Sequence, residues 1–318
     1  MTPNYPQCIE LPLPFRHIAP MRTTKIPSVA AATALLTIGL SLLFAPPSSP
    51  AQTPEALKAF EQYVRAAEAQ VQSAQDLSAT KNFLTIDALP EAMRTQTYAQ
   101  LKQGQTVIER ARALPTCPAP PGALIHDWTS TVFVPNVSLA QTLAALQDYD
   151  RDADYYRPQV VNSKLLAKSD HHYQVFLRLK QKHIITVVLD TEYEIQYTPV
   201  DPTHATSQSH STRIAEVENA DSSEEHIHIP GDDHGFLWRL NSYWRFHEVD
   251  GGVYIQCNAI SLTRNVPPSL NWIIAPFVEN IPRDSLRFTL TATREALLKK
   301  FTSPQTTGAG KSPKSNSE

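Results

Sequence analysis

The sequence predicts an α+β domain in which a run of antiparallel strands is followed by one long C-terminal helix. Between residues 160 and 264, apolar and polar side chains alternate in successive segments, as they do along strands. Turn residues separate these segments, most clearly Asp250-Gly251-Gly252, which suits a short hairpin. Residues 281–301 then carry apolar side chains at helical spacing, namely Leu286, Leu290, Leu297 and Phe301.

The composition narrows the possible partners and cofactors. The chain has 318 residues and a formal charge of −3, which allows one large domain with appendages or two domains. Because there is no excess of basic residues, nucleic acid is not an expected partner. There are only 9 glycines and no glycine-rich phosphate loop, so we expect no cofactor. The oligomeric state stays open.

Residues 1–51 have the pattern of an export signal. Arg22 and Lys25 precede an apolar run from Val29 to Phe44, and small residues follow up to Ala51, after which we place cleavage. Met21 is an alternative start, because residues 1–20 lack signal character. A retained membrane anchor is the alternative, although the run is shorter than the roughly 20 residues that a spanning helix needs. The expected location is the periplasm or the extracellular space.

The remainder divides into four parts. Residues 52–114 form a predicted helical arm, with helices at 53–75 and 90–103 and an undetermined strand or helix at 106–113. The arm covers either the mouth of a cavity or the outer face of the sheet. The other parts are a proline-rich linker at 115–122, the main domain at 123–301 and a disordered tail at 302–318.

The main domain begins with a strand at 128–134 and a helix capped by Ser138. Further strands follow, and then an apolar, proline-punctuated connection at 265–278 leads to the last helix. The predicted strands are 160–166, 172–180, 183–197, 210–218, 235–249 and 253–264.

The last hairpin has one wide aromatic face. Alternation places Phe236, Trp238, Leu240, Ser242, Trp244 and Phe246 together. The opposite face carries Leu237, Arg239, Asn241, Tyr243, Arg245 and His247. A wide apolar sheet face must be covered by a helix or by a ligand, which favours a cavity.

This order of elements resembles the helix-grip fold of the START/SRPBCC superfamily. The resemblance covers about residues 124–301 and rests on local features as well as on the order. They are Val137 to Asp150 after the first strand, the Asp250-Gly251-Gly252 hairpin, the connection from Pro267 to Phe277, and Arg283 to Leu298. It implies a curved sheet that grips the last helix around an apolar cavity. The superfamily has no universal catalytic motif, so the resemblance implies a cavity and no particular reaction.

Candidate ligand-binding residues follow from the hairpin and the connection after it: Trp238, Arg239, Tyr243, Trp244, Phe246 and Trp272. Plain core packing is the alternative for the aromatic residues. If its face points inward, Arg239 could orient a carboxylate or phosphate headgroup. If that face points outward, the strip pairs with the acidic residues Asp190, Glu192 and Glu194.

Two further sets of residues allow more than one interpretation. His226 and His228 share a strand face near Asp232, Asp233 and His234 and could reach one ion. Their polar surroundings favour a loop instead, so no metal site is predicted. After export, Cys117 and Cys257 could form a disulfide or remain separate thiols.

These features predict an exported binding protein for a hydrophobic small molecule or lipid, a role compatible with transient membrane contact. The alternative is an enzyme of the cyclase or dehydratase type that uses the same cavity, for which an inward Tyr, Glu or His with a shifted pKa is required. A third interpretation is a cavity-free envelope protein that binds partners through its helical arm.

Overall fold

The computed structural model describes residues 52–75, 82–111, 117, 119–182, 185–265 and 271–301, with side chains omitted at 70–75 and 271–279. The chain divides into the compact units Met1–Ser49 and Pro50–Glu318, and all the described residues belong to the second unit. The predicted export signal and the tail lie outside the described residues. Among the helices that are described, none is both long and apolar enough to cross a membrane.

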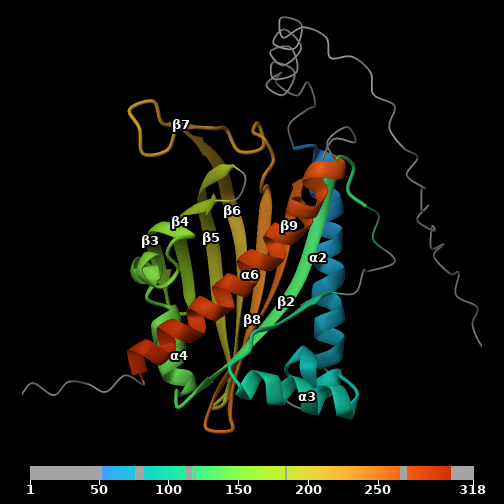
Figure 1. The fold of residues 1–318 in the computed structure, drawn as a ribbon, viewed down its shortest axis with the longest axis vertical. Helices are drawn as coiled ribbons and strands as arrows, with labels where there is room; N and C mark the ends of the chain where they lie inside the picture. Colours follow the sequence, from blue (N-terminus) through green and yellow to red (C-terminus); the bar gives the residue numbers. More distant parts are fainter. Residues whose placement is uncertain are drawn as a thin grey trace, which may run out of the picture. The chain divides into compact units, whose positions relative to one another are not determined.

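A nine-stranded antiparallel sheet forms the centre of this unit (Figure 1). Its neighbours run in the order β1-β2-β9-β8-β6-β5-β4-β3, and β7 pairs with β6 alone. The strands are β1 (Val107–Arg110), β2 (Ala123–Pro135), β3 (Val160–Ser169), β4 (His172–Lys182), β5 (Thr186–Asp201), β6 (His204–Glu218), β7 (His226–Ile227), β8 (Arg239–Val249) and β9 (Gly252–Arg264).

Helices cover both faces of the sheet. The long helix α6 (Asn271–Phe301) crosses one face, here called the inner face, where α4 (Leu139–Leu146) also packs (Figure 1). The short elements η2 (Tyr149–Arg151) and α5 (Asp152–Tyr155) follow α4. The opposite, outer face is covered by α2 (Pro54–Gln75), η1 (Thr85–Ala88) and α3 (Glu91–Lys102). The predicted helix-grip architecture, with its C-terminal helix on a large antiparallel sheet, is confirmed.

The start of α4 is fixed by local sequence. Ser138 accepts a hydrogen bond from the backbone N–H of Gln141, and the Gln141 side chain accepts one from the N–H of Ser138. This reciprocal capping box satisfies two donors that would otherwise lack partners at the helix start. The predicted Ser138 cap is therefore confirmed. A similar cap lies at the start of α2, where the Thr53 hydroxyl accepts a hydrogen bond from the N–H of Ala56.

The β8–β9 hairpin closes through the predicted turn. Asp250 and Gly251 have φ angles of 61° and 76°, the two positive values that a tight two-residue hairpin turn needs. Gly252 faces a second constraint, because a Cβ atom there would lie 2.3 Å from the carbonyl oxygen of Val134. Glycine at this position allows the end of β2 to approach the turn.

The inner and outer faces hold separate cores. On the inner face, Val132, Phe246, Ile255 and Cys257 join Leu286, Leu290 and Leu297 of α6 in one buried cluster. On the outer face, Phe60 and Val64 of α2 pack on Ile260 and Leu262, while Phe83 and Leu101 pack on Phe133 and Tyr254.

The N-terminal arm therefore covers the outer face of the sheet, one of the two placements left open by the sequence. Its undetermined segment at 106–113 contains strand β1, which pairs with β2 from Val107–Thr131 to Arg110–Trp128. Gln256 and Thr85 also exchange hydrogen bonds: the backbone N–H of Thr85 donates to Oε1 of Gln256, and the amide of Gln256 donates to the Thr85 hydroxyl. Arm and sheet are thus joined by strand pairing, apolar burial and polar contacts.

The prediction that the last helix begins at residue 281 is wrong. Helix α6 begins at Asn271 and continues through Pro276 and Pro282. A proline inside a helix costs about 3 kcal/mol because it removes a donor and crowds the preceding turn. Beyond Pro282, burial of Leu286, Leu290 and Leu297 in the inner core offsets part of this cost.

The predicted end of β5 at Tyr197 is also too early. The strand continues through Pro199 to Asp201, and β6 already begins at His204. The prolines of this segment predict a break in the chain, yet a strand tolerates proline where its N–H has no ladder partner or where the ladder is irregular. The pairing here does shift register between Pro199 and Asp201.

The predicted pairing between the acidic strip of β5 and the polar strip of β8 is wrong, because β6 lies between these strands. Asp190 pairs instead with Arg178 of β4, through Nε–Oδ1 and Nη2–Oδ2 hydrogen bonds of 2.7 and 2.9 Å. Arg178 also donates to both carboxylate oxygens of Glu225. Glu192 pairs with Arg213 of β6 at 3.6 Å. Asp190 and Glu192 thus make ion pairs with arginines of the adjacent strands.

We expect Arg178→Ala to lower the free energy of unfolding by roughly 3 kcal/mol, because it leaves Asp190 as a buried charge without its partner. The Asp190 side chain is 5% exposed and that of Arg178 is 19% exposed. Arg213→Ala is the matched control on the same sheet. It removes one long, partly exposed contact and should cost less than about 1 kcal/mol. Equal losses in denaturant titrations would contradict this interpretation of the two pairs.

Candidate ligand-binding face

The centre of the inner face is built from aligned rows of side chains. Ladder pairing places Trp128 of β2 beside Ala259 of β9, Ala259 beside Ser242 of β8, and Ser242 beside Ser209 of β6. One row below, Ser130, Cys257, Trp244 and Ser207 are neighbours in the same order. Both rows mix tryptophan with small side chains.

Several side chains at the middle of this face remain partly exposed. They are Trp128, Leu240, Ser242, Trp244 and Ala259, which lie on central strands of the face that α6 crosses. Flanking inner-face residues such as Ile255 and Phe246 are almost completely buried. Apolar surface is thus accessible at the middle of the inner face. We call these five residues the inner-face row.

Trp244 and Phe246, two of the predicted ligand-binding residues, lie with this inner core. Their rings stack nearly parallel, at 7° and 6.2 Å between centroids. The indole N–H of Trp244 donates to the Ser242 hydroxyl at 3.1 Å, so its one polar group is already satisfied. The partly exposed part of Trp244 is therefore apolar surface without an unsatisfied polar group.

The prediction that Trp238 shares a face with Trp244 is wrong. Strand β8 begins only at Arg239, and a bend at Trp238 breaks the alternation. Trp238 packs in the outer cluster with Phe60 and Leu262, and its indole N–H donates to Asp233.

Arg239 and Tyr243 also lie on the outer face, so the inward placement of their strip is wrong. The Tyr243 hydroxyl donates to Glu68 of α2 at 2.7 Å, and the Arg239 guanidinium donates to the carbonyl of Trp238. Burial lowers the pKa of Arg239, with Glu61 of α2 acting in the opposite direction. Trp272 falls in the first turn of α6, and its side chain lies outside the described residues.

His126 is a polar inner-face residue that the sequence pattern does not single out. It lies on β2 one row above Trp128, and its Nε2 atom is 3.0 Å from the Thr263 hydroxyl. Burial, assisted by nearby Arg110, lowers the pKa of His126 to about 4. Its imidazole is therefore neutral at neutral pH.

Buried tyrosine hydroxyls and one carboxyl gather where η2 and α5 meet the sheet. The hydroxyls of Tyr149 and Tyr197 lie 3.0 Å apart, and that of Tyr156 lies 2.9 Å from Thr293 of α6. Burial, together with Asp148, raises the pKa of the Asp152 carboxyl well above its usual range. Burial likewise raises the pKa of Tyr149 and of Tyr197. This end of the inner face thus holds neutral acids.

The sequence carries little signal for these groups. His126 stands at an alternating strand position, but it precedes the predicted strand at 128–134. The tyrosines and Asp152 come from the end of a predicted helix, and only the tertiary fold brings them to Tyr197 and Thr293. Cys117 and Cys257 are free thiols, so the disulfide that the sequence allows is not formed.

A small open pocket lies elsewhere, at strands β3 to β6. It has a volume of about 130 Å³ and is lined by Leu166, Gln174, Glu192, Tyr193, Glu194 and Thr212. Ligand pockets usually enclose about 300–1,000 Å³. This depression is small and largely polar, so we assign it no ligand.

No protein-family model matches the sequence, and no curated protein matches it. Among solved structures, similar folds include the STAR-related lipid transfer protein from Xanthomonas axonopodis (16% identity, TM-score 0.38, covering 60% of this chain and 98% of that one). A second is the Zhui aromatase/cyclase from Streptomyces sp. R1128, with 13% identity and a TM-score of 0.37, covering 56% of this chain and 95% of that one. A third is human STARD10, with 8% identity and a TM-score of 0.36, covering 67% of this chain and 84% of that one. The START-like helix-grip architecture is visible in this chain's own strand order and final helix, and these distant likenesses say nothing about its ligand.

We expect His126 to make the protein sensitive to acid between pH 6.5 and about 4. In this window the unfolded chain binds a proton at His126 and the folded chain does not, so stability falls as pH falls and levels off below the folded pKa. A shift of this size corresponds to roughly 3 kcal/mol. Denaturant titrations should show His126→Gln losing less stability than wild type between pH 7 and pH 4.5. Parallel losses in both proteins would remove His126 as the cause.

Proposed function

We propose that this protein binds a hydrophobic small molecule or lipid between the inner face of the sheet and α6. The observation that carries the proposal is the inner-face row, whose side chains remain partly exposed on the face that α6 crosses. Ligand sites are typically apolar with a few convergent polar groups. Here Trp128, Leu240 and Trp244 supply apolar surface, and Ser242 and Ser209 supply hydroxyls beside it.

Apolar burial would supply most of the affinity. Each Å² of apolar surface removed from water contributes about 25 cal/mol, so a ligand that buries about 300 Å² gains about 7 kcal/mol before ordering costs. A rigid pocket keeps those costs low, and the packed flanks of this face at Ile255, Phe246 and Leu290 support that condition. Arg239 takes no part in this proposal, because it lies against α2.

We propose further that the protein is exported. The supporting features are the basic residues Arg22 and Lys25, the apolar run from Val29 to Phe44 and the small residues that end at Ala51. A periplasmic or secreted carrier of a hydrophobic ligand would exchange that ligand by transient contact with a membrane.

Native mass spectrometry of the protein purified under mild conditions should detect a bound hydrophobic molecule at near one-to-one stoichiometry. The same spectrum should give a mature chain that begins at Gln52. A pyrene-labelled fatty acid then serves as the binding probe. We expect Trp244→Ala to weaken probe binding at least tenfold with little loss of thermal stability, because it removes accessible apolar surface from the inner face.

Trp238→Ala is the matched control, since both tryptophans belong to the same hairpin region and lie on opposite faces. It should lower the melting temperature by disturbing the contact with α2 and leave probe affinity unchanged. The reverse assignment, with Trp244→Ala destabilising and Trp238→Ala impairing binding, would overturn the proposed location. An empty protein that also fails to bind the probe would overturn the function.

A further inference from the structure

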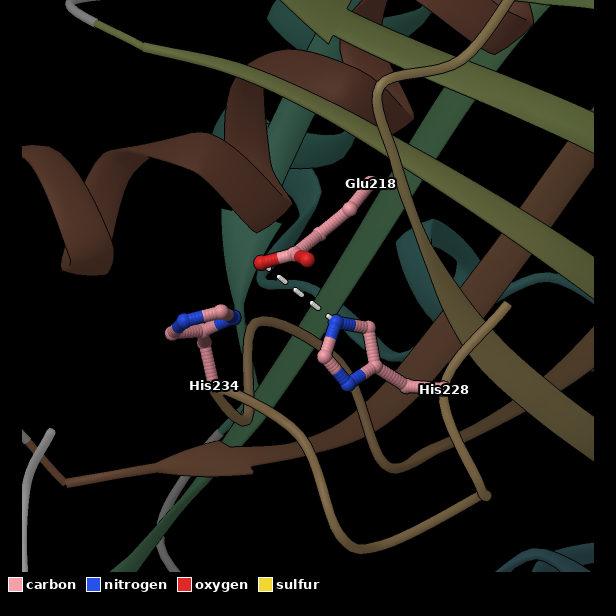
Figure 2. Close-up of side chains that lie close together, drawn as sticks. All are labelled: Glu218, His228 and His234. Atoms are coloured by element: carbon pink, nitrogen blue, oxygen red, sulfur yellow. Dashed lines mark ion pairs between the residues drawn. The ribbon is translucent and has the colours of Figure 1, made fainter. Parts of the chain in front are cut away.

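Three potential metal ligands converge where β6 ends and the connection to β8 begins. Glu218 is the last residue of β6, His228 follows β7, and His234 lies farther along the same connection (Figure 2). One ligand atom from each of the three lies within 4.8 Å of the other two. The Nε2 atom of His228 lies 3.5 Å from Oε1 of Glu218. These three side chains, which lie up to 16 positions apart in the sequence, thus point toward one another.

These spacings are close to those of a tetrahedral zinc site. Zinc binds nitrogen and oxygen at about 2.0–2.2 Å, which places neighbouring ligand atoms about 3.3 Å apart. The measured His228–Glu218 separation of 3.5 Å is already near this value. Small rotations of side chains would bring His234 to the same distance.

His234 is oriented by a buried carboxylate behind it. Its Nδ1 atom lies 2.9 Å from Oε2 of Glu216, a side chain that is 5% exposed. The same carboxylate accepts hydrogen bonds from the backbone N–H groups of His234 and Phe236. Metal-binding histidines commonly place one ring nitrogen on a carboxylate in this way, which leaves the other nitrogen for the metal.

His228 offers an independent indication. Its Nε2 atom is buried and makes no hydrogen bond within the part of the chain that the structure describes. Its backbone N–H donates to the carbonyl of Glu216, which fixes the residue beside Glu218. A buried polar atom that makes no hydrogen bond costs free energy, and a cation bound between His228 and Glu218 would contact it directly.

The chemistry of the three ligands selects the kind of cation. Two imidazoles and one carboxylate suit zinc, whereas calcium and magnesium prefer sites made of oxygen alone. Glu218 and His234 are each half-exposed, so water can reach the fourth position. The sequence pattern pairs His226 with His228, but the group that converges in the fold consists of Glu218, His228 and His234.

We propose that Glu218, His228 and His234 bind one zinc ion, which fastens the 219–238 connection to the end of β6. Glu216 acts as a positioning residue through His234. The connection is also held by protein contacts elsewhere. Glu225 accepts hydrogen bonds from Arg178, and the backbone N–H of Gln52 donates to the carbonyl of Gly231. The zinc ion would add an anchor where the connection leaves β6 at Glu218.

The test uses the untagged full chain, stripped with a chelator, and zinc sulfate as the probe. Equilibrium dialysis with elemental analysis should give one zinc per chain, and competition with a chromophoric chelator gives the affinity. Removing a residue that hydrogen-bonds a metal-binding histidine typically lowers metal affinity about 10- to 100-fold. We therefore expect Glu216→Gln to cost about that much with unchanged stoichiometry, and Glu218→Ala and His234→Ala to cost more.

His171→Ala is the matched control, an exposed histidine in the turn between β3 and β4 that should leave zinc affinity unchanged. Folding of each variant is checked by its melting temperature without zinc. Hydrogen exchange of residues 226–236 should slow on adding zinc to wild type and not to His234→Ala. Either of two results would overturn the proposal. If wild type binds no zinc, the cluster is only an ion pair. If both Glu218→Ala and His234→Ala still bind zinc with wild-type affinity, the metal lies elsewhere.

Discussion

The register of the β2–β9–β8 ladder decides which side chains face α6 and which face the arm. Thirteen consecutive pairs join β2 to β9, from Ala123–Arg264 to Pro135–Gly252. A slip of one residue would exchange the two faces along the entire strand. The Asp250-Gly251 turn fixes the register on one side of β9, and the close approach of Gly252 to Val134 fixes it on the other. The accessible inner-face row and the docking surface of α2 are therefore consequences of the same constraint.

Much of the architecture was predictable because strand alternation, the Ser138 cap and the Asp250-Gly251 turn are local signals. The failures have physical causes that are not local. Trp238 stands next to β8, but the chain enters the strand through a bend, so alternation cannot be extended back to it. Pro276 and Pro282 are strong local breakers, yet α6 continues through both of them. In each case the tertiary packing outweighs a local preference.

The functional residues were harder to predict because both faces of the central strands are covered. Alternation separates Tyr243 from Trp244, but it cannot say which of them faces α6 and which faces α2. Tyr243 of the sheet donates to Glu68 of α2, and Tyr63 of α2 donates to Asp127 of the sheet. These contacts make the polar strip a docking surface for α2 instead of a headgroup site. His126, Asp152 and the Tyr149–Tyr197 pair take on shifted pKa values only through burial, and a single sequence does not show burial at individual positions.

The proposed zinc site and the proposed ligand site are linked through one segment of chain. Residues 219–238 leave the end of β6 at Glu218 and return at Arg239, the first residue of the strand that carries Ser242 and Trp244. A metal that orders this segment also restricts the start of β8, where Leu240 belongs to the accessible row. Linkage is reciprocal, so any effect of zinc on ligand affinity would equal the effect of ligand on zinc affinity. The two sites nevertheless share no side chain, and each can therefore be removed by substitution without removing the other.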